Sequence, residues 1–122
     1  MTTNELTVTV RNHGDAAVLD LGGDIDRDAD AALQHAYDLA VDGGATQVLL
    51  NFAAVGYINS TGIAVIVGLL ARARRDRRPI SAYGLSEHYR RIFTITRLSD
   101  FIGLYPDEDS AAAATPAATQ QP

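Results

Sequence analysis

The segment from Thr46 to Gly84 constrains the fold more than any other part of the sequence. It opens with TQVLLNF (46–52), a β-rich run with three adjacent apolar residues, which is typical of a strand covered on both faces. An apolar stretch at helical spacing follows and predicts a helix from Ser60 to about Arg78, and PISAYG (79–84) predicts a further strand. A strand, a helix and a strand in this order are expected to form a right-handed crossover between parallel strands.

The flanking segments predict further elements of the same layered structure. Apolar residues that alternate with threonine predict a half-buried strand, and apolar residues three and four apart predict helices. The expected elements are a β-hairpin with strands at 6–10 and 16–23 and a turn at 12–15, helices at about 29–40 and from Ser86, and a short strand or extended segment at 101–105. This order predicts one α/β domain over residues 1–110, and the Ala/Thr/Pro/Gln composition of residues 111–122 predicts a disordered tail.

The composition excludes several classes of function. The 122 residues include no cysteine, which rules out disulfides, thiolate zinc sites and cysteine nucleophiles, and no lysine, which rules out Schiff-base chemistry. Ten basic against fifteen acidic residues give a net charge of −5, so direct nucleic-acid binding is not expected. The first ten residues lack the features of a signal peptide, and the longest apolar run, Gly62 to Ala71, is about half of a bilayer span. We therefore expect a cytoplasmic protein without membrane insertion.

A polar stretch, Asn59-Ser60-Thr61-Gly62, begins the apolar helix and has two explanations. The first is structural: the first amides of a helix lack partners within it, and Asn59 or Ser60 at the cap position would satisfy one of them. The second is functional, because Gly62 costs about 1 kcal/mol relative to alanine, and a glycine there lets another surface or a phosphate approach the backbone. The helix behind it is apolar on nearly all sides, so it is either deeply buried or presents an apolar strip to a partner.

A phosphorylated serine at this place would act as a binding switch. A phosphoryl group adds roughly −1.5 to −2 charges and three strong hydrogen-bond acceptors. The partly positive start of a helix tolerates that charge, so the fold would survive. A docked partner that presents carboxylates or apolar surface would be repelled, since like-charge juxtaposition costs several kcal/mol.

Three motifs in order carry a resemblance to a known family. GYINSTGIAVIVGLL (56–70) resembles the signature of bacterial anti-sigma factor antagonists of the STAS domain family, in which an acidic residue, Ser, Ser or Thr, and Gly precede an apolar helix. GGDID (22–26) is similar to the family's segment after the second strand, and RIFTITRLSDFIGLYPDEDSA (91–111) is similar to its C-terminal helix, short strand and acidic final segment. Asn59 stands where the family usually has the acidic residue, and it caps a helix as well but lacks the charge.

The resemblance implies a STAS-like fold, a four- to five-stranded mixed β-sheet with helices packed mainly on one face. It implies that Ser60, with Thr61 as the second choice, is phosphorylated by a partner that is both an anti-sigma factor and a serine kinase. Unphosphorylated, the protein would bind that kinase and release the sigma factor, and a serine phosphatase of the PP2C type would reset it. The alternative is a STAS module of a transporter or of a multiprotein signalling complex that does not act on a sigma factor. The implied partner-binding residues are Asn59, Ser60, Thr61, Gly62, Ile63, Asp24 and Asp26.

Two charged clusters have simpler explanations than ligand binding. The acidic cluster comprises Asp24, Asp26, Asp28 and Asp30, and the basic cluster comprises Arg72, Arg74, Arg75, Arg77 and Arg78. A calcium loop counted from Asp24 needs glycine at its sixth position and glutamate at its twelfth, but Ala29 and His35 stand there. Acidic residues are favoured at a helix N-terminus and arginines at a helix C-terminus by the helix dipole, and this explanation is preferred over metal, nucleic-acid or lipid binding.

Catalysis at Ser60 is not expected. A serine nucleophile needs a base, and the sequence offers only His13, His35 and His88, with no Gly-x-Ser-x-Gly elbow. A phosphate-binding loop needs Gly-x4-Gly-Lys, but five residues separate Gly56 from Gly62 and no lysine follows. We therefore predict a non-enzymatic protein that uses neither a cofactor nor a metal.

Overall fold

The computed structural model describes residues 4–114, which form a five-stranded mixed sheet with the order β1-β2-β3-β4-β5. β1 is antiparallel to β2, and the strands from β2 to β5 are parallel. The elements are β1 (Thr7–His13), β2 (Ala16–Ile25), the 3-10 turn η1 (Arg27–Ala29), α1 (Asp30–Asp42), β3 (Gln47–Ile58), α2 (Ser60–Arg75), β4 (Ile80–Tyr83), α3 (Glu87–Ile95), the 3-10 turn η2 (Leu98–Asp100), β5 (Gly103–Tyr105) and α4 (Glu108–Ala113). The predicted mixed α/β sheet is confirmed.

The crossover predicted over residues 46–84 is present, because α2 connects the parallel neighbours β3 and β4. α2 ends at Arg75 rather than at Arg78, since Arg77 takes up the left-handed conformation with φ of 56°. β3 continues well beyond the predicted end at Phe52, because its second half pairs with residues 22–25 of β2.

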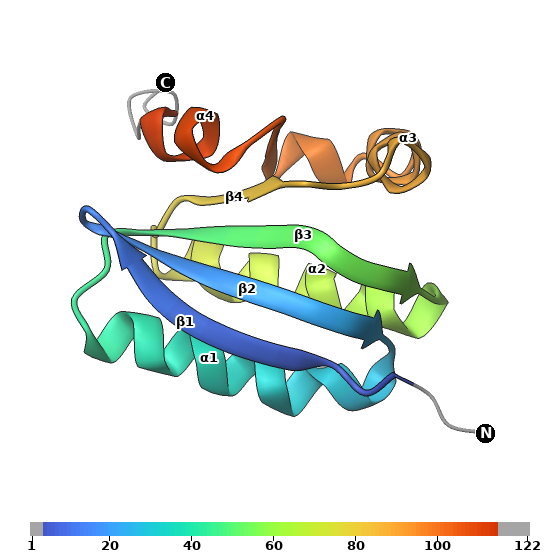
Figure 1. Ribbon diagram of the computed structural model, residues 1–122, viewed down its shortest axis with the longest axis horizontal. Coiled ribbons are helices and arrows are strands. Elements are labelled where there is room, and N and C mark those ends of the chain that lie inside the picture. The colour runs from blue at the N-terminus through green and yellow to red at the C-terminus, as the bar shows by residue number, and fades with distance from the viewer. Residues whose placement is uncertain (1–3, 115–122) are drawn as a thin grey trace.

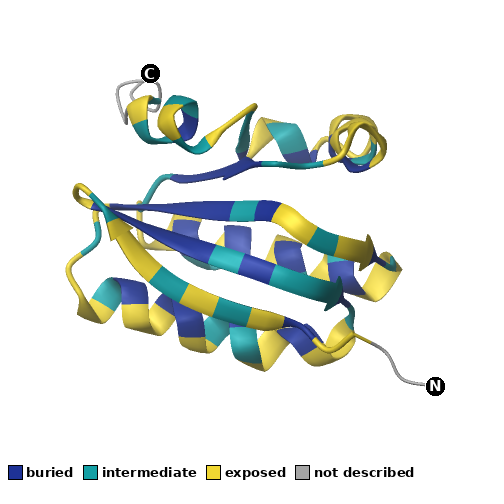
Figure 2. Ribbon diagram, viewed as in Figure 1, coloured by how far each residue is buried: buried dark blue, intermediate teal, exposed yellow. Residues whose placement is uncertain are grey.

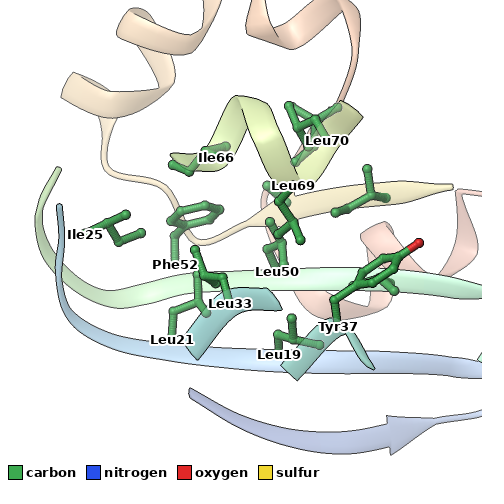
Figure 3. Close-up of a cluster of buried hydrophobic side chains, with 14 of the residues drawn as sticks. Leu19, Leu21, Ile25, Leu33, Tyr37, Leu50, Phe52, Ile66, Leu69 and Leu70 are labelled. Atoms are coloured by element: carbon green, nitrogen blue, oxygen red, sulfur yellow. The ribbon is translucent and has the colours of Figure 1, made fainter. Parts of the chain in front are cut away.

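α1 and α2 lie side by side against one face of the sheet and enclose the main core (Figure 1). Figure 2 shows β4 buried along its length, whereas β1 alternates between exposed and half-buried residues as an edge strand should. The buried residues of α1 are three or four positions apart and comprise Leu33, Ala36, Tyr37 and Ala40. They meet inward-facing side chains of the strands and of α2, including Leu19, Leu50, Phe52 and Leu69 in Figure 3.

α4 covers part of the opposite face of the sheet. Its fully buried Ala111 belongs to a second, smaller cluster with Ala16, Val18, Leu49 and Tyr83. The helices therefore lie mainly on one face, as expected. The prediction of a disordered tail from Ala111 is wrong for residues 111–113, because Asp107 caps α4 by accepting a hydrogen bond from the Ser110 amide (2.8 Å) and Ala111 is buried. The remaining tail, residues 115–122, lies outside the described residues.

Glu108 connects α4 to two strands of the sheet, β1 and β4. Its carboxylate accepts hydrogen bonds from the Arg11 guanidinium (2.5 and 2.9 Å) and from the Tyr83 hydroxyl (2.8 Å), and it lies 2.6 Å from Nδ1 of His13. Arg11 also pairs with Asp20 at 2.6 Å. These partners, Arg11 first and His13 second, lower the pKa of Glu108 to about 2.

Candidate functional site

Asn59 is the cap of α2. Its backbone is extended (φ −92°, ψ −178°), and its side-chain oxygen accepts hydrogen bonds from the Gly62 amide and from the Thr61 hydroxyl, both at 2.8 Å. Of the two cap candidates in the sequence, Asn59 therefore satisfies the free amide, and Ser60 is the first residue of the helix itself. The hydroxyl of Ser60 is not needed to start the helix.

Ser60 is exposed, and within residues 4–114 its hydroxyl makes no hydrogen bond. Thr61 is also exposed, but its hydroxyl is held by the Asn59 side chain. The two neighbouring hydroxyls thus differ: one is engaged in the cap, and the other faces solvent at the positive end of a helix. An enzyme that modifies this segment from outside can reach the Ser60 oxygen without breaking an existing bond.

Gly62 is buried against the end of β2. A Cβ atom at this position would overlap the carbonyl oxygen of Ile25 and lie 2.6 Å from its carbonyl carbon. The close approach inferred from the sequence is real, but the surface that approaches is the chain's own backbone rather than a phosphate or a partner. Ile63 is half-buried and packs against the main core. Both residues thus help to place the exposed residues beside them, and their predicted contact with a partner stays a prediction.

Asp24 and Asp26 lie at the same edge of the sheet as Ser60. β2 and β3 are parallel, so their ends meet there: Asp24 is paired in register with Tyr57, and the Asn59 amide donates to the Ile25 carbonyl at 3.2 Å. The carboxylate of Asp26 caps η1 by accepting from the Asp28 amide at 2.9 Å. The structure therefore places the end of β2, with Asp24 and Asp26, beside the start of α2.

Two residues of this edge were missed by the sequence analysis. Tyr57, three residues before Ser60, is 55% exposed and presents an aromatic ring to solvent. Tyr89 of α3 is buried, and its hydroxyl accepts a hydrogen bond from the buried Ile58 amide at 2.9 Å. Helical spacing after Ser86 predicts only that Tyr89 lies on the apolar face of its helix. The signal for its second role is the hydroxyl, since a purely packing role would not need it.

Within residues 4–114 no histidine forms a hydrogen bond with Ser60. His13 pairs with Glu108 at the far side of the sheet, whereas His35 and His88 are exposed helix residues, with the His88 ring at the edge of Tyr89. Among residues 4–114 no group of three or more His, Cys, Asp or Glu side chains could hold a metal ion. No helix in the same range has the length and hydropathy needed to cross a bilayer.

Residues 8–105 match the protein family described as Mlab, STAS domain. The chain belongs to the STAS domain family. Anti-sigma-F factor antagonist RsfB of Mycobacterium tuberculosis is 32% identical over 104 residues, which cover 75% of this chain and 85% of RsfB. The "Anti-sigma-B factor antagonist" of Staphylococcus epidermidis is 30% identical over 97 residues, or 80% of this chain and 90% of that protein.

Solved structures show the same fold at lower identity. An anti-sigma factor antagonist from Mycobacterium paratuberculosis matches this STAS domain with a TM-score of 0.76 at 23% identity, covering 90% of this chain and 93% of that one. The parallel strands that end beside the start of α2 are therefore a feature of the fold itself. The relatives named above are anti-sigma factor antagonists, so STAS domains of this kind are binding modules.

Proposed function

We propose that this STAS domain is an anti-sigma factor antagonist controlled by phosphorylation of Ser60. Unphosphorylated, it binds an anti-sigma factor that is also a serine kinase, and the sigma factor is released in the cytoplasm. The kinase transfers the γ-phosphoryl group of ATP to Oγ of Ser60: the new O–P bond replaces the phosphoanhydride bond, ADP leaves, and the hydroxyl proton passes to a base on the kinase. A PP2C-type serine phosphatase then hydrolyses the phosphoester.

The observation that carries this proposal is that Asn59 caps α2 while the neighbouring Ser60 hydroxyl faces solvent. Because Asn59 provides the cap, the Ser60 hydroxyl is exposed and without a partner among the described residues. A phosphate on it would add charge at the positive end of α2, where the helix dipole favours an anion. The fold would remain intact while a partner docked on Tyr57, Ser60 and Thr61 met a new dianion.

The names of the relatives support the choice of partner, since RsfB and its counterpart in Staphylococcus epidermidis are named as antagonists of anti-sigma factors. Asp24 and Asp26 already add negative charge at the same edge, and a phosphate on Ser60 would increase it. A partner that presents carboxylates or apolar surface toward Ser60 would therefore be repelled.

The test is incubation with the anti-sigma kinase of the same organism and ATP, followed by mass spectrometry of the peptide around Ser60. Phosphate on Ser60 is expected, with none on a Ser60→Ala variant and with Ser60 still phosphorylated in a Thr61→Ala variant. Phosphate on Thr61, or a kinase that neither binds nor modifies the wild-type protein, would contradict the proposal. Stable association with a membrane permease instead would assign the chain to a transporter.

A further inference from the structure

A second surface lies at the opposite end of α2 from Ser60. It is a groove of about 1080 Å³ between the C-terminal half of α2 and the η2–β5 segment. Its lining includes buried apolar residues of both walls, among them Leu70, Leu98 and Ile102. At the rim Val67 and Phe101 are 44% and 55% exposed, so the apolar surface continues to solvent. The rise of an α-helix places this groove roughly 20 Å from Ser60.

The groove is strongly basic although the whole chain has a net charge of −5. The arginines that line it are Arg74, Arg77, Arg78 and Arg97, and the acidic residue that lines it, Asp100, is already paired with Arg97 at 2.8 Å. Within residues 4–114, Arg74 and Arg77 form no ion pair. The Arg74 guanidinium lies 5.3 Å from the centre of the Phe101 ring, so cation and aromatic ring form one surface.

Two of these arginines occupy a backbone conformation that favours glycine. Arg77 (φ 56°) follows the end of α2, and Arg97 (φ 69°) follows the end of α3, and they are the two non-glycine residues with positive φ in the described range. Glycine is the usual residue at this position after a helix, because it has no Cβ to clash. The helix dipole explains why cations are favoured in the last turn of a helix. It does not explain why arginine stands where the backbone favours glycine, and residues in such strained conformations cluster at functional sites.

Two other arginines of the basic cluster, Arg72 and Arg78, have internal roles. Arg72 pairs with Asp38 and lies over the Tyr37 ring, and Arg78 donates to the Ala45 carbonyl at 3.0 Å and to the Tyr37 hydroxyl at 3.0 Å. The charges left available to a partner are those of Arg74 and Arg77, and they lie beside the apolar floor. The groove thus offers cations at its rim and aliphatic side chains at its base.

We infer that this groove docks an acidic amphipathic segment of a protein partner, with aliphatic or aromatic side chains on the groove floor and carboxylates on the arginines. The charge complementarity selects this occupant, because unpaired guanidinium groups bind carboxylates in bidentate fashion. A nucleic-acid ligand is not favoured, because the chain as a whole has a net charge of −5. The chain's own residues 115–122, TPAATQQP, contain no acidic residue and lack this complementarity.

The test uses the full chain and a short fluorescein-labelled peptide in which pairs of Asp and Glu alternate with pairs of Leu and Phe. Fluorescence anisotropy is expected to show micromolar binding that weakens with salt. Arg74→Glu and Arg77→Glu together should weaken it about a hundredfold, given the cost of like-charge contacts at an interface. Arg75→Glu is the matched control, since it makes the same kind of charge change on the same helix at an exposed position outside the groove. The affinity of this variant for the peptide should stay within about twofold of the wild-type value.

Three results would overturn the inference. The first is equal binding of a peptide in which Lys replaces the acidic residues, and the second is an equal loss of affinity with Arg75→Glu. The third is binding of an RNA oligonucleotide or of phosphatidylserine vesicles, but not of the acidic peptide, in a way that depends on Arg74 and Arg77. Ser60→Asp is expected to leave peptide binding unchanged, so failure here and failure of the proposed switch are distinguishable.

Discussion

Gly62 lies so close to Ile25 that a Cβ atom on it would overlap the Ile25 carbonyl oxygen. The same carbonyl accepts the Asn59 amide at 3.2 Å, so the end of β2 holds both the cap and the first turn of α2. The exposed hydroxyl of Ser60 is therefore positioned by contacts between backbone segments rather than by a side chain of its own. The position of the site therefore depends on a glycine that is buried against the end of β2.

Gly62→Ala is expected to destabilise the protein by about 2–3 kcal/mol, because neither the Ile25 backbone nor the first turn of α2 can move without disturbing the core. Urea unfolding followed by circular dichroism measures the change. Gly68→Ala is the control in the same helix: no atom lies within 4 Å of a Cβ built there, and the substitution should stabilise by about 0.5–1 kcal/mol. If both substitutions changed the free energy of unfolding in the same direction, this explanation would be contradicted.

Asn59→Ala is expected to lower stability by about 1 kcal/mol, since the Gly62 amide loses its partner. Asn59→Asp keeps the cap and adds a negative charge at the start of α2, so its stability should equal or exceed that of the wild type. Thermal unfolding of the three proteins under identical conditions measures both effects. A destabilised Asn59→Asp variant would show that the amide nitrogen of Asn59 has a role of its own.

Ser60→Asp is expected to abolish binding of the anti-sigma kinase while the unfolding free energy changes by less than about 0.5 kcal/mol, because the side chain is exposed at the positive end of a helix. Ser60→Ala should bind persistently and resist phosphorylation. Calorimetric titration against the kinase, paired with urea unfolding, separates the two quantities. Loss of binding together with loss of stability would point to a damaged fold instead of a switch.

Tyr89→Phe tests how α3 supports the edge that carries Ser60. The variant keeps the ring but removes the acceptor of the buried Ile58 amide, and an unsatisfied buried amide costs about 1–3 kcal/mol. Hydrogen exchange of the Ile58 amide should become faster as stability falls. His88→Phe alters a neighbouring, exposed ring and serves as the control, with little expected effect on either measurement.

The sequence allowed the crossover, the parallel sheet and the polar start of α2 to be predicted, because each depends on local pattern. Alternation and helical spacing indicate which residues face a core, and Asn59 and Gly62 are informative wherever a helix begins. The family signature then added the grouping of Asp24 and Asp26 with Ser60. None of this required knowledge of distant contacts.

The missed features all depend on contacts between segments far apart in sequence. The length of β3 is set by pairing with β2, and the purpose of Gly62 is set by Ile25, neither of which has a local signal. The last helical turn at 111–113 was assigned to a tail because alanine-rich composition does not reveal burial. In the sequence, Tyr89 looks like any aromatic residue on the apolar face of a helix, and only the fold places its hydroxyl beside the Ile58 amide.

Glu108 determines how α4 responds to acid. Its pKa falls from the ordinary value of 4.5 to about 2 in the folded protein, chiefly through Arg11 and then His13. A carboxyl group with a lowered folded pKa contributes stability that is complete above its unfolded pKa and is lost as the pH falls through the folded one. The contribution is therefore present at neutral pH and disappears between about pH 4.5 and pH 2.

Glu108→Gln should lower stability at pH 7 by about 2 kcal/mol, because Arg11 and the Tyr83 hydroxyl lose a charged acceptor that is only partly exposed. The variant should also unfold with a shallower pH dependence between pH 4.5 and 2 than the wild type. Part of the dependence will remain, since Arg11 also holds the pKa of Asp20 below its usual value. Urea unfolding at a series of pH values measures both effects, and parallel curves for the two proteins would show that Glu108 is not the group that titrates.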